Sequence, residues 1–205
     1  MMQTVLLRHG RTAWNAAKRT QGRTDIPLSD DGRAELAGRR LPPEIDSPLW
    51  LSSPLRRAHE TAAILRGTTV DTIPVDARLT EMNFGEWEGF TYAELQARDT
   101  INDPSGLAAQ ERLGLDMCPP GGETPREVLA RFTDLLRDLD HRHPRPARVV
   151  MVCHKGLIRA ALAGASGWDM TGPPPWKIDW RAAQVLAWTA DRLSINRLNV
   201  PLLNP

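Results

Sequence analysis

The chain has 205 residues, 41% of them hydrophobic and 25% charged, with a formal net charge of +1. These values fit one well-packed globular domain and exclude a disordered chain or one that coats nucleic acid over its whole surface. No stretch approaches the roughly 18 apolar residues of a membrane helix, and MMQTVLLRHG at the N-terminus lacks the pattern of a secretion signal. Two cysteines imply no disulfide framework, so a cytoplasmic location is expected.

The N-terminal half alternates short apolar runs with helical segments. A strand is predicted at residues 4–7, followed by a polar loop, and a helix begins at Ser29 with two aspartates in its first turn. A second strand is predicted at 49–51, a helix at 54–66, and a third strand at 70–75.

The C-terminal half carries the strongest local signals. Capping boxes at Thr91 and Thr124 each predict a helix start, and the second helix, 125–140, has an apolar stripe at helical spacing. Residues 148–153 are the clearest strand, continuous, apolar and partly β-branched. The remaining predicted elements are a helix at 156–164 and strands at 184–189 and 193–200, joined by a turn at 190–192. Strands that alternate with helices predict a layered α/β domain with a largely parallel sheet.

Three predicted strands end on chemically reactive sequence: Arg8-His9-Gly10, the run at 52–56, and His154-Lys155-Gly156. Ligands of open α/β sheets gather at the carboxyl ends of the strands, so these segments are expected to share one pocket. Arginine matches phosphate oxygens bidentately, and glycine permits close approach of the backbone. A phosphoryl site is therefore one interpretation, and solvated surface charges are the other.

Residues 78–89 add an acidic segment with three glutamates, Glu81, Glu86 and Glu88, around two aromatic residues. A carboxylic acid beside aromatic bulk suits general acid catalysis, because such surroundings favour the protonated form. The residues alone do not say which of the three would serve.

Six segments together resemble the histidine phosphatase superfamily, the phosphoglycerate-mutase-like proteins. The segments are RHGRTAWN, the Gly22-x-x-Asp25-x-Pro27-Leu28-Ser29 stretch, SSPLRRAHETA, LTEMNFGEWEG, PGGET at 120–124, and VCHKGLIR. The resemblance runs from Leu6 to about Arg159 and implies a single three-layer domain over residues 1–205, with helices on both faces of the sheet.

The resemblance also implies roles for particular residues. His9 would be the nucleophile that forms a phosphohistidine, and Glu81 would protonate the departing alcohol. Arg8, Arg56 and His154 would hold the phosphoryl oxygens. Asn15, Gln21 and Gly22 would complete the substrate pocket, with no metal and no other cofactor.

The expected activity is hydrolysis of a small phosphorylated metabolite, since the chain is short between Gly89 and Pro120, where a mutase would need material to enclose its phosphoenzyme. A mutase-type phosphoryl transferase and a low-turnover phospho-ligand binding protein are the alternatives. Leaving-group contacts are expected from residues 90–120 and 172–179. No membrane partner is expected, and the oligomeric state stays open, with a homodimer as one option.

Other readings of the same residues are weaker. A metal site on His9, His154, Cys153 and a carboxylate lacks a recognised ligand spacing, and arginines would repel the cation. Nucleic-acid binding at Lys18, Arg19 and Arg23 lacks interleaved aromatic residues. Cys153 is expected in the core, and His59, His141 and His143 are expected to be structural or solvated.

Lys155 departs from the family pattern, which commonly has a small residue after the second histidine. The lysine is expected to face solvent, with a position at the pocket rim as the alternative. Trp176 and Trp180 are expected to pack rather than to line the pocket.

Overall fold

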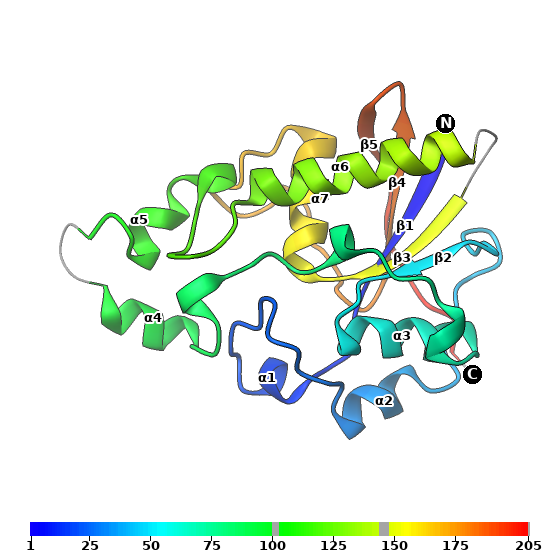
Figure 1. Ribbon diagram of the computed structural model, residues 1–205, viewed down its shortest axis with the longest axis horizontal. Helices are drawn as coiled ribbons and strands as arrows, with labels where there is room; N and C mark the ends of the chain where they lie inside the picture. The colour runs from blue at the N-terminus through cyan, green and yellow to red at the C-terminus, as the bar shows by residue number, and fades with distance from the viewer. Residues whose placement is uncertain (100–102, 144–147, 205) are drawn as a thin grey trace.

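Figure 1 shows the computed structural model, in which one mixed sheet lies between two layers of helices. The structure describes residues 1–99, 103–143 and 148–204. The strands are β1 (Met2–Arg8), β2 (Trp50–Ser52), β3 (Arg148–Cys153), β4 (Ala183–Thr189) and β5 (Arg192–Val200). Their order is β2-β3-β1-β4-β5. The three strands β2, β3 and β1 are parallel, whereas β4 and β5 add antiparallel pairs at one edge.

Seven α-helices occur in the described part of the chain. They are α1 (Ala13–Ala16), α2 (Asp30–Leu36), α3 (Arg56–Arg66), α4 (Tyr92–Arg98), α5 (Leu107–Glu111), α6 (Pro125–Arg142) and α7 (Lys155–Ser166). Short 3₁₀ turns cover Val70–Thr72, Ala77–Leu79, Gly85–Trp87 and Gly114–Asp116.

Each face of the sheet has its own apolar core, because side chains alternate along every strand. On one face Leu6 and Met151 pack with residues of α6 and α7, including Phe132. On the other face Val5 and Val150 pack with residues of α2 and α3. Figure 1 shows the same division, with α6 and α7 on one side of the sheet and α2 and α3 on the other. The predicted three-layer α/β fold is confirmed, with the antiparallel β4–β5 pair as an addition to the parallel centre.

Helices with a strong local cap follow the prediction closely. Thr91 and Thr124 form both predicted capping boxes, and Gly67 ends α3 with a left-handed φ of 69°. The start of α3 lies two residues later than predicted, because Pro54 precedes the N-cap instead of opening the helix. His141 belongs to the last turn of α6 and not to a loop, and residues 144–147 of that predicted loop lie outside the described residues.

The predicted strand at 70–75 is wrong. Residues Val70–Thr72 form a 3₁₀ turn, and Val75 contributes only an isolated parallel bridge to Ser52. The Thr72 hydroxyl donates to the Thr69 carbonyl 2.8 Å away, a local bond that competes with strand pairing. Only Ile73 is buried here, so a strand would have gained little apolar contact.

None of the described helices is both long enough and apolar enough to cross a membrane.

Candidate active site

The carboxyl ends of β2, β3 and β1 meet at one edge and bring three remote segments together. The backbone N–H of His9 donates to the Cys153 carbonyl at 3.0 Å, and the N–H of Ser53 donates to the Val152 carbonyl at 3.0 Å. His9 and His154 therefore lie side by side, with ring centroids 5.1 Å apart, and both are buried. This neighbourhood follows from the parallel register that pairs Arg8 with Cys153.

The His9 ring is held in one tautomer. Its Nδ1 lies 2.7 Å from the Gly10 carbonyl oxygen, which can only accept, so Nδ1 carries the proton and Nε2 keeps a free electron pair. The Gly10 N–H in turn donates to the Thr61 hydroxyl of α3 at 2.9 Å. Burial, together with the charges of Arg8 and Arg57, holds the pKa of His9 well below its ordinary value. The imidazole is therefore neutral and available as a nucleophile at neutral pH.

His154 is oriented by Ser53. The Ser53 hydroxyl accepts from the Leu55 N–H at 3.2 Å and lies 2.8 Å from His154 Nε2, which is the one acceptor among the described residues within reach of the hydroxyl proton. Burial, followed by the neighbouring His9, keeps the pKa of His154 well below its ordinary value. A neutral ring that accepts at Nε2 carries its proton on Nδ1. That Nδ1 is buried without a partner in the described structure.

Arg57, and not Arg56, belongs to the site. The Arg57 side chain is fully buried and donates to the Gly22 carbonyl at 2.6 Å and to the Thr24 carbonyl at 2.8 Å. The side chain of Arg56 is exposed, and within the described part of the chain its one hydrogen bond to a side chain is from its backbone N–H to the Asp25 carboxylate. The prediction that Arg56 reaches the phosphoryl pocket is therefore corrected. The helical turn directs the second arginine of the pair inward, on the same face of α3 as Thr61.

Three buried donors of this site have no hydrogen-bond partner among the described residues: Arg8 Nε, Arg57 Nε and His154 Nδ1. Burial lowers the pKa of both arginines, which stay charged because the ordinary value is so high. Buried N–H groups without acceptors are costly, and two adjacent cations repel each other. A bound oxyanion would satisfy the donors and the charges together.

Glu81 is the acidic member of the site. Its carboxylate accepts from the N–H groups of Met82, Gly156 and Leu157 at 2.9, 3.1 and 3.2 Å, and its side chain is buried. Two of these donors belong to the first turn of α7, so this helix fixes the position of the carboxyl group. Glu86 is not held in this way, and Glu88 instead accepts from Arg23, Thr24 and Phe84 in the neighbouring loop.

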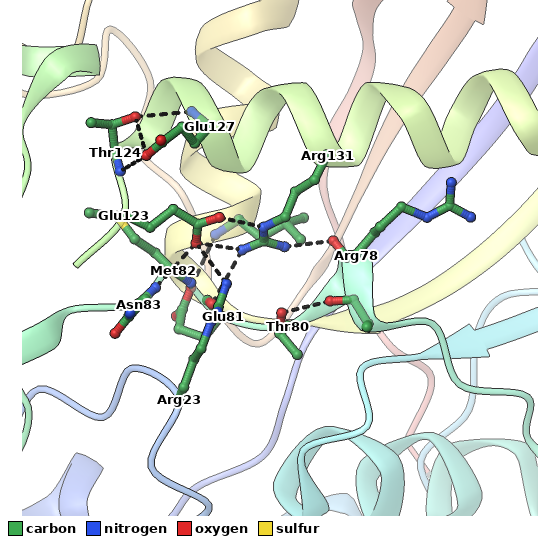
Figure 2. A network of polar contacts seen from close by, with 12 residues as sticks. Arg23, Arg78, Thr80, Glu81, Met82, Asn83, Glu123, Thr124, Glu127 and Arg131 are labelled. Carbon is green, nitrogen blue, oxygen red and sulfur yellow. Dashed lines mark hydrogen bonds and ion pairs between the residues drawn. The ribbon is translucent and has the colours of Figure 1, made fainter. Parts of the chain in front are cut away.

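A second layer of contacts fixes the backbone at Glu81 (Figure 2). Arg131 of α6 donates to the carbonyls of Glu81 and Arg78 and binds the Glu123 carboxylate at 2.8 and 3.1 Å. Glu123 also accepts from the Asn83 N–H at 3.2 Å. Burial acts to raise the pKa of Glu123, but the hydrogen bonds and charge of Arg131 outweigh it and lower that pKa.

Asn15, Gln21 and Gly22 border the same site. Asn15 Oδ1 accepts from the Thr12 backbone, and Gln21 Oε1 accepts from the Thr12 hydroxyl, so one residue orients both amides. Gly22 has a left-handed φ of 53°, and a β-carbon there would overlap the Glu88 carboxylate. The contribution of Gly22 is thus its carbonyl, which accepts from Arg57, and its lack of a side chain.

Two cavities, of 830 and 690 Å³, meet at Arg8, His9 and Asn15. The larger one also contains Glu81 and Lys155, together with Tyr92 and Glu111 from the 90–120 region and Gly172 from the later loop. Both regions predicted to contact the leaving group therefore contribute residues to the larger cavity. Residues 100–102 of the first region lie outside the described residues. The volume of this cavity suits a small metabolite.

Lys155 is exposed and at the same time lines the larger cavity, with Nζ 5.4 Å from the ring centroid of Trp180. Trp176 and Trp180 pack against the core as predicted, and Trp180 also borders the smaller cavity.

Cys153 is buried, and burial raises the pKa of its thiol far above the ordinary value. His59 contacts the Ile73 carbonyl. Within the described residues, no three His, Cys, Asp or Glu side chains are grouped as a metal ion would require.

A family model described as histidine phosphatase superfamily (branch 1) matches residues 4–201. This chain belongs to that superfamily. Glucosyl-3-phosphoglycerate phosphatase of Mycobacterium tuberculosis is 39% identical over 174 residues, which is 78% of this chain and 73% of the relative. An acid phosphatase of the same organism is 30% identical over 190 residues, covering 80% of this chain and 92% of its own. The predictions of the superfamily and of a phosphatase-type enzyme are confirmed.

Solved structures agree at the level of the whole fold. A mycobacterial glucosyl-3-phosphoglycerate phosphatase in complex with VO3 superposes with a TM-score of 0.77 at 31% identity, over 97% of this chain and 98% of the other. A phosphoserine phosphatase mutant from Entamoeba histolytica, in complex with phosphoserine, superposes with a TM-score of 0.75 at 25% identity, covering 97% of both chains.

Four residues of the site were not predicted from the sequence: Ser53, Thr61, Glu123 and Arg131. Thr61 carries a usable signal, since it lies four residues after Arg57 among alanines on one helical face. Arg131 interrupts the pattern of α6 beside buried residues, which is a weaker signal. No local pattern marks Ser53, whose partner is 101 residues away.

Proposed function

We propose that this chain hydrolyses phosphomonoesters of small metabolites in two steps through a phosphohistidine at His9. The observation that carries the proposal is the set of buried, unpartnered donors from Arg8, Arg57 and His154 beside a neutral His9. These groups match the oxygens of one phosphoryl group, and phosphoryl transfer depends mainly on positioning and on charge stabilisation.

In the first step the electron pair on His9 Nε2 attacks phosphorus, and the bond from phosphorus to the ester oxygen breaks. The departing alcohol oxygen takes a proton from the Glu81 carboxyl group. In the second step a water molecule attacks the phosphohistidine and gives its proton to the Glu81 carboxylate. The N–P bond breaks, its electron pair returns to Nε2, and inorganic phosphate leaves. Glu81 thus ends the cycle in the state in which it began.

Phosphate release from p-nitrophenyl phosphate tests the nucleophile. His9→Ala should abolish it, whereas His59→Ala, which changes a histidine of α3 that contacts the Ile73 carbonyl, should keep it. Rapid quenching of the wild type should trap an acid-labile, base-stable phosphoenzyme. Strong activity in His9→Ala, or an acid-stable adduct, would overturn the assignment. Activity in excess chelator is expected to be unchanged.

A mutase-type transferase is the second candidate, because a phosphoglycerate mutase-like protein of Arabidopsis thaliana is 33% identical over 77% of this chain and 68% of its own. The fate of the phosphoryl group distinguishes a phosphatase from a mutase. Release of phosphate without isomerisation of 3-phosphoglycerate to 2-phosphoglycerate is expected.

A cytoplasmic setting is part of the proposal, supported by two cysteines that are free and not paired.

A further inference from the structure

The larger cavity has a cationic wall that the two chemical steps do not use. Lys155 and Arg159 lie one helical turn apart on α7 and line this cavity together with His9 and Glu81. A separation of four residues places their backbone positions about 6 Å apart along the helix axis.

Neither cation is neutralised by a carboxylate. No acidic side chain of the described chain lies within 4.0 Å of either group, although such pairs are frequent elsewhere on this protein. The acid that attracts Arg159 most strongly is Glu111, whose carboxylate is engaged by the Tyr92 hydroxyl at 2.9 Å.

Aromatic faces hold the two cations in place. Lys155 Nζ lies 5.4 Å from the Trp180 ring centroid, and Arg159 Cζ lies 5.2 Å from that of Trp168, which itself packs edge-on against Trp176. Such contacts orient a cation without cancelling its charge. The Lys155 side chain keeps contact with solvent, but the surrounding residues partly desolvate it and lower its pKa, and repulsion from Arg159 and Arg8 adds to the effect. An anion bound between these groups would relieve that repulsion.

The position of Glu81 indicates where the leaving group lies relative to this cationic wall. The Glu81 carboxylate is bound by the N–H groups of Gly156 and Leu157, which lie between Lys155 and Arg159 in the sequence. An alcohol oxygen that receives its proton from Glu81 therefore lies beside α7. The rest of the leaving group continues along the cavity that both cations border.

We propose that Lys155 and Arg159 form a second anion-binding subsite, which selects phosphomonoesters whose alcohol carries a carboxylate or a second phosphate a few atoms from the ester oxygen. Lys155 is the specificity-determining residue of this pair, since it directly follows His154 at the start of α7, whereas Arg159 lies one turn further along the helix. The inference rests on the proposed phosphatase activity.

A matched pair of probes tests the subsite. Glycerol 3-phosphate and 3-phosphoglycerate share a three-carbon skeleton and differ by a hydroxymethyl group against a carboxylate. The wild type should prefer 3-phosphoglycerate by about tenfold or more in kcat/KM, the size expected for one charge-assisted hydrogen bond. Propane-1,3-diol bisphosphate carries a second phosphate instead, and the better of the two anionic probes identifies the anion.

Variants assign the preference to the residues. Lys155→Met and Arg159→Met should each bring the ratio close to one while kcat/KM for glycerol 3-phosphate stays within about threefold, and Lys155→Arg should retain the preference. Lys177→Met removes the same charge from the wall of the smaller cavity and should leave the ratio unchanged. Titration of the same probes into His9→Ala by calorimetry reports the preference without turnover.

The outcomes separate the two proposals. Hydrolysis of p-nitrophenyl phosphate with no preference for either anionic probe, in turnover and in binding, overturns the subsite alone. A ratio that falls only in Lys177→Met also overturns it, because the second anion would then occupy the other cavity. No hydrolysis of any phosphomonoester overturns the proposed function, while the calorimetric preference still decides the subsite.

Discussion

Gly156 shows how one missing side chain positions the acid of the site. A β-carbon at this position would overlap Glu81 Oε1, although the backbone there has ordinary helical geometry. The glycine is therefore required by the close approach of the carboxylate to the first turn of α7, and not by backbone conformation.

We expect Gly156→Ala to lower kcat by about 10²–10⁴-fold for alkyl phosphates, the range that general acid catalysis contributes. Aryl phosphates should lose far less, because their leaving groups need little protonation. The helix itself should not weaken, since alanine is the better helix former. Steady-state kinetics on both substrate types, with thermal unfolding as the control, checks this. An equal loss on alkyl and aryl substrates would contradict the role of Glu81.

The adjacent arginines of α3 offer a matched comparison. Arg57→Met should lower kcat/KM by at least about 10²-fold, because the phosphoryl site loses a buried cation. It should also lower the melting temperature, since the carbonyls of Gly22 and Thr24 lose their donor. Arg56→Met changes an exposed side chain and should stay within about twofold of wild type. Arg57→Lys, which keeps the charge, separates loss of activity from misfolding. Similar losses in Arg56→Met and Arg57→Met would contradict the assignment of Arg57, and not Arg56, to the phosphoryl site.

At the scale of elements, the site depends on how α6 is joined to the segment that carries Glu81. The capping box of Thr124 and Glu127 sets the start of α6, and Arg131, two turns further, reaches the carbonyls of Arg78 and Glu81 (Figure 2). Local sequence is sufficient to predict the start of this helix. It is not sufficient to predict the bond from Arg131 to Glu81, which spans 50 residues.

Arg131→Met should destabilise the protein by about 2–3 kcal/mol, because Glu123 and two carbonyls lose a largely buried charged donor. Urea unfolding measures this. Arg126→Met, which removes an exposed pair with Asp116, is the control and should leave the unfolding midpoint unchanged. Activity of the folded Arg131→Met protein should also fall, since the backbone at Glu81 is less restrained. Full activity with full stability would show that this network is dispensable.

At the scale of the whole molecule, the site consists of strand ends from both halves of the chain, closed in so that both histidines are buried. Desolvation is the largest cause of the lowered pKa of His9 and of His154. Folding therefore holds two imidazoles neutral, whereas in the unfolded chain they accept protons below about pH 6.5.

The sign of the resulting pH dependence follows from proton uptake. Between about pH 6.5 and 5, the unfolded state binds more protons than the folded state, so the free energy of unfolding should fall as the pH falls. The slope should be up to about 1.4 kcal/mol per pH unit for each histidine. Urea unfolding in phosphate-free buffers measures it, because bound phosphate would stabilise the folded state. The double variant His9→Gln, His154→Gln should flatten the slope, and an unchanged slope would contradict burial of the two rings as its cause.

The predicted elements succeeded where local interactions are enough. The capping boxes at Thr91 and Thr124, the apolar run at 148–153 and the stop at Gly67 each act within a few residues. The strand predicted at 70–75 failed, because pairing with a distant strand decides whether an apolar run becomes part of a sheet.

By itself the sequence determined the fold class, the superfamily and the segments that carry His9, Glu81 and His154, since each lies in a distinctive local pattern. Only the tertiary structure decided between Arg56 and Arg57 and joined Ser53 to His154. It also placed Lys155 and Arg159 on the cavity wall. The physical reason is that burial, charge and hydrogen-bond partners come from segments far apart in the chain. Those properties exist only once the strands are side by side.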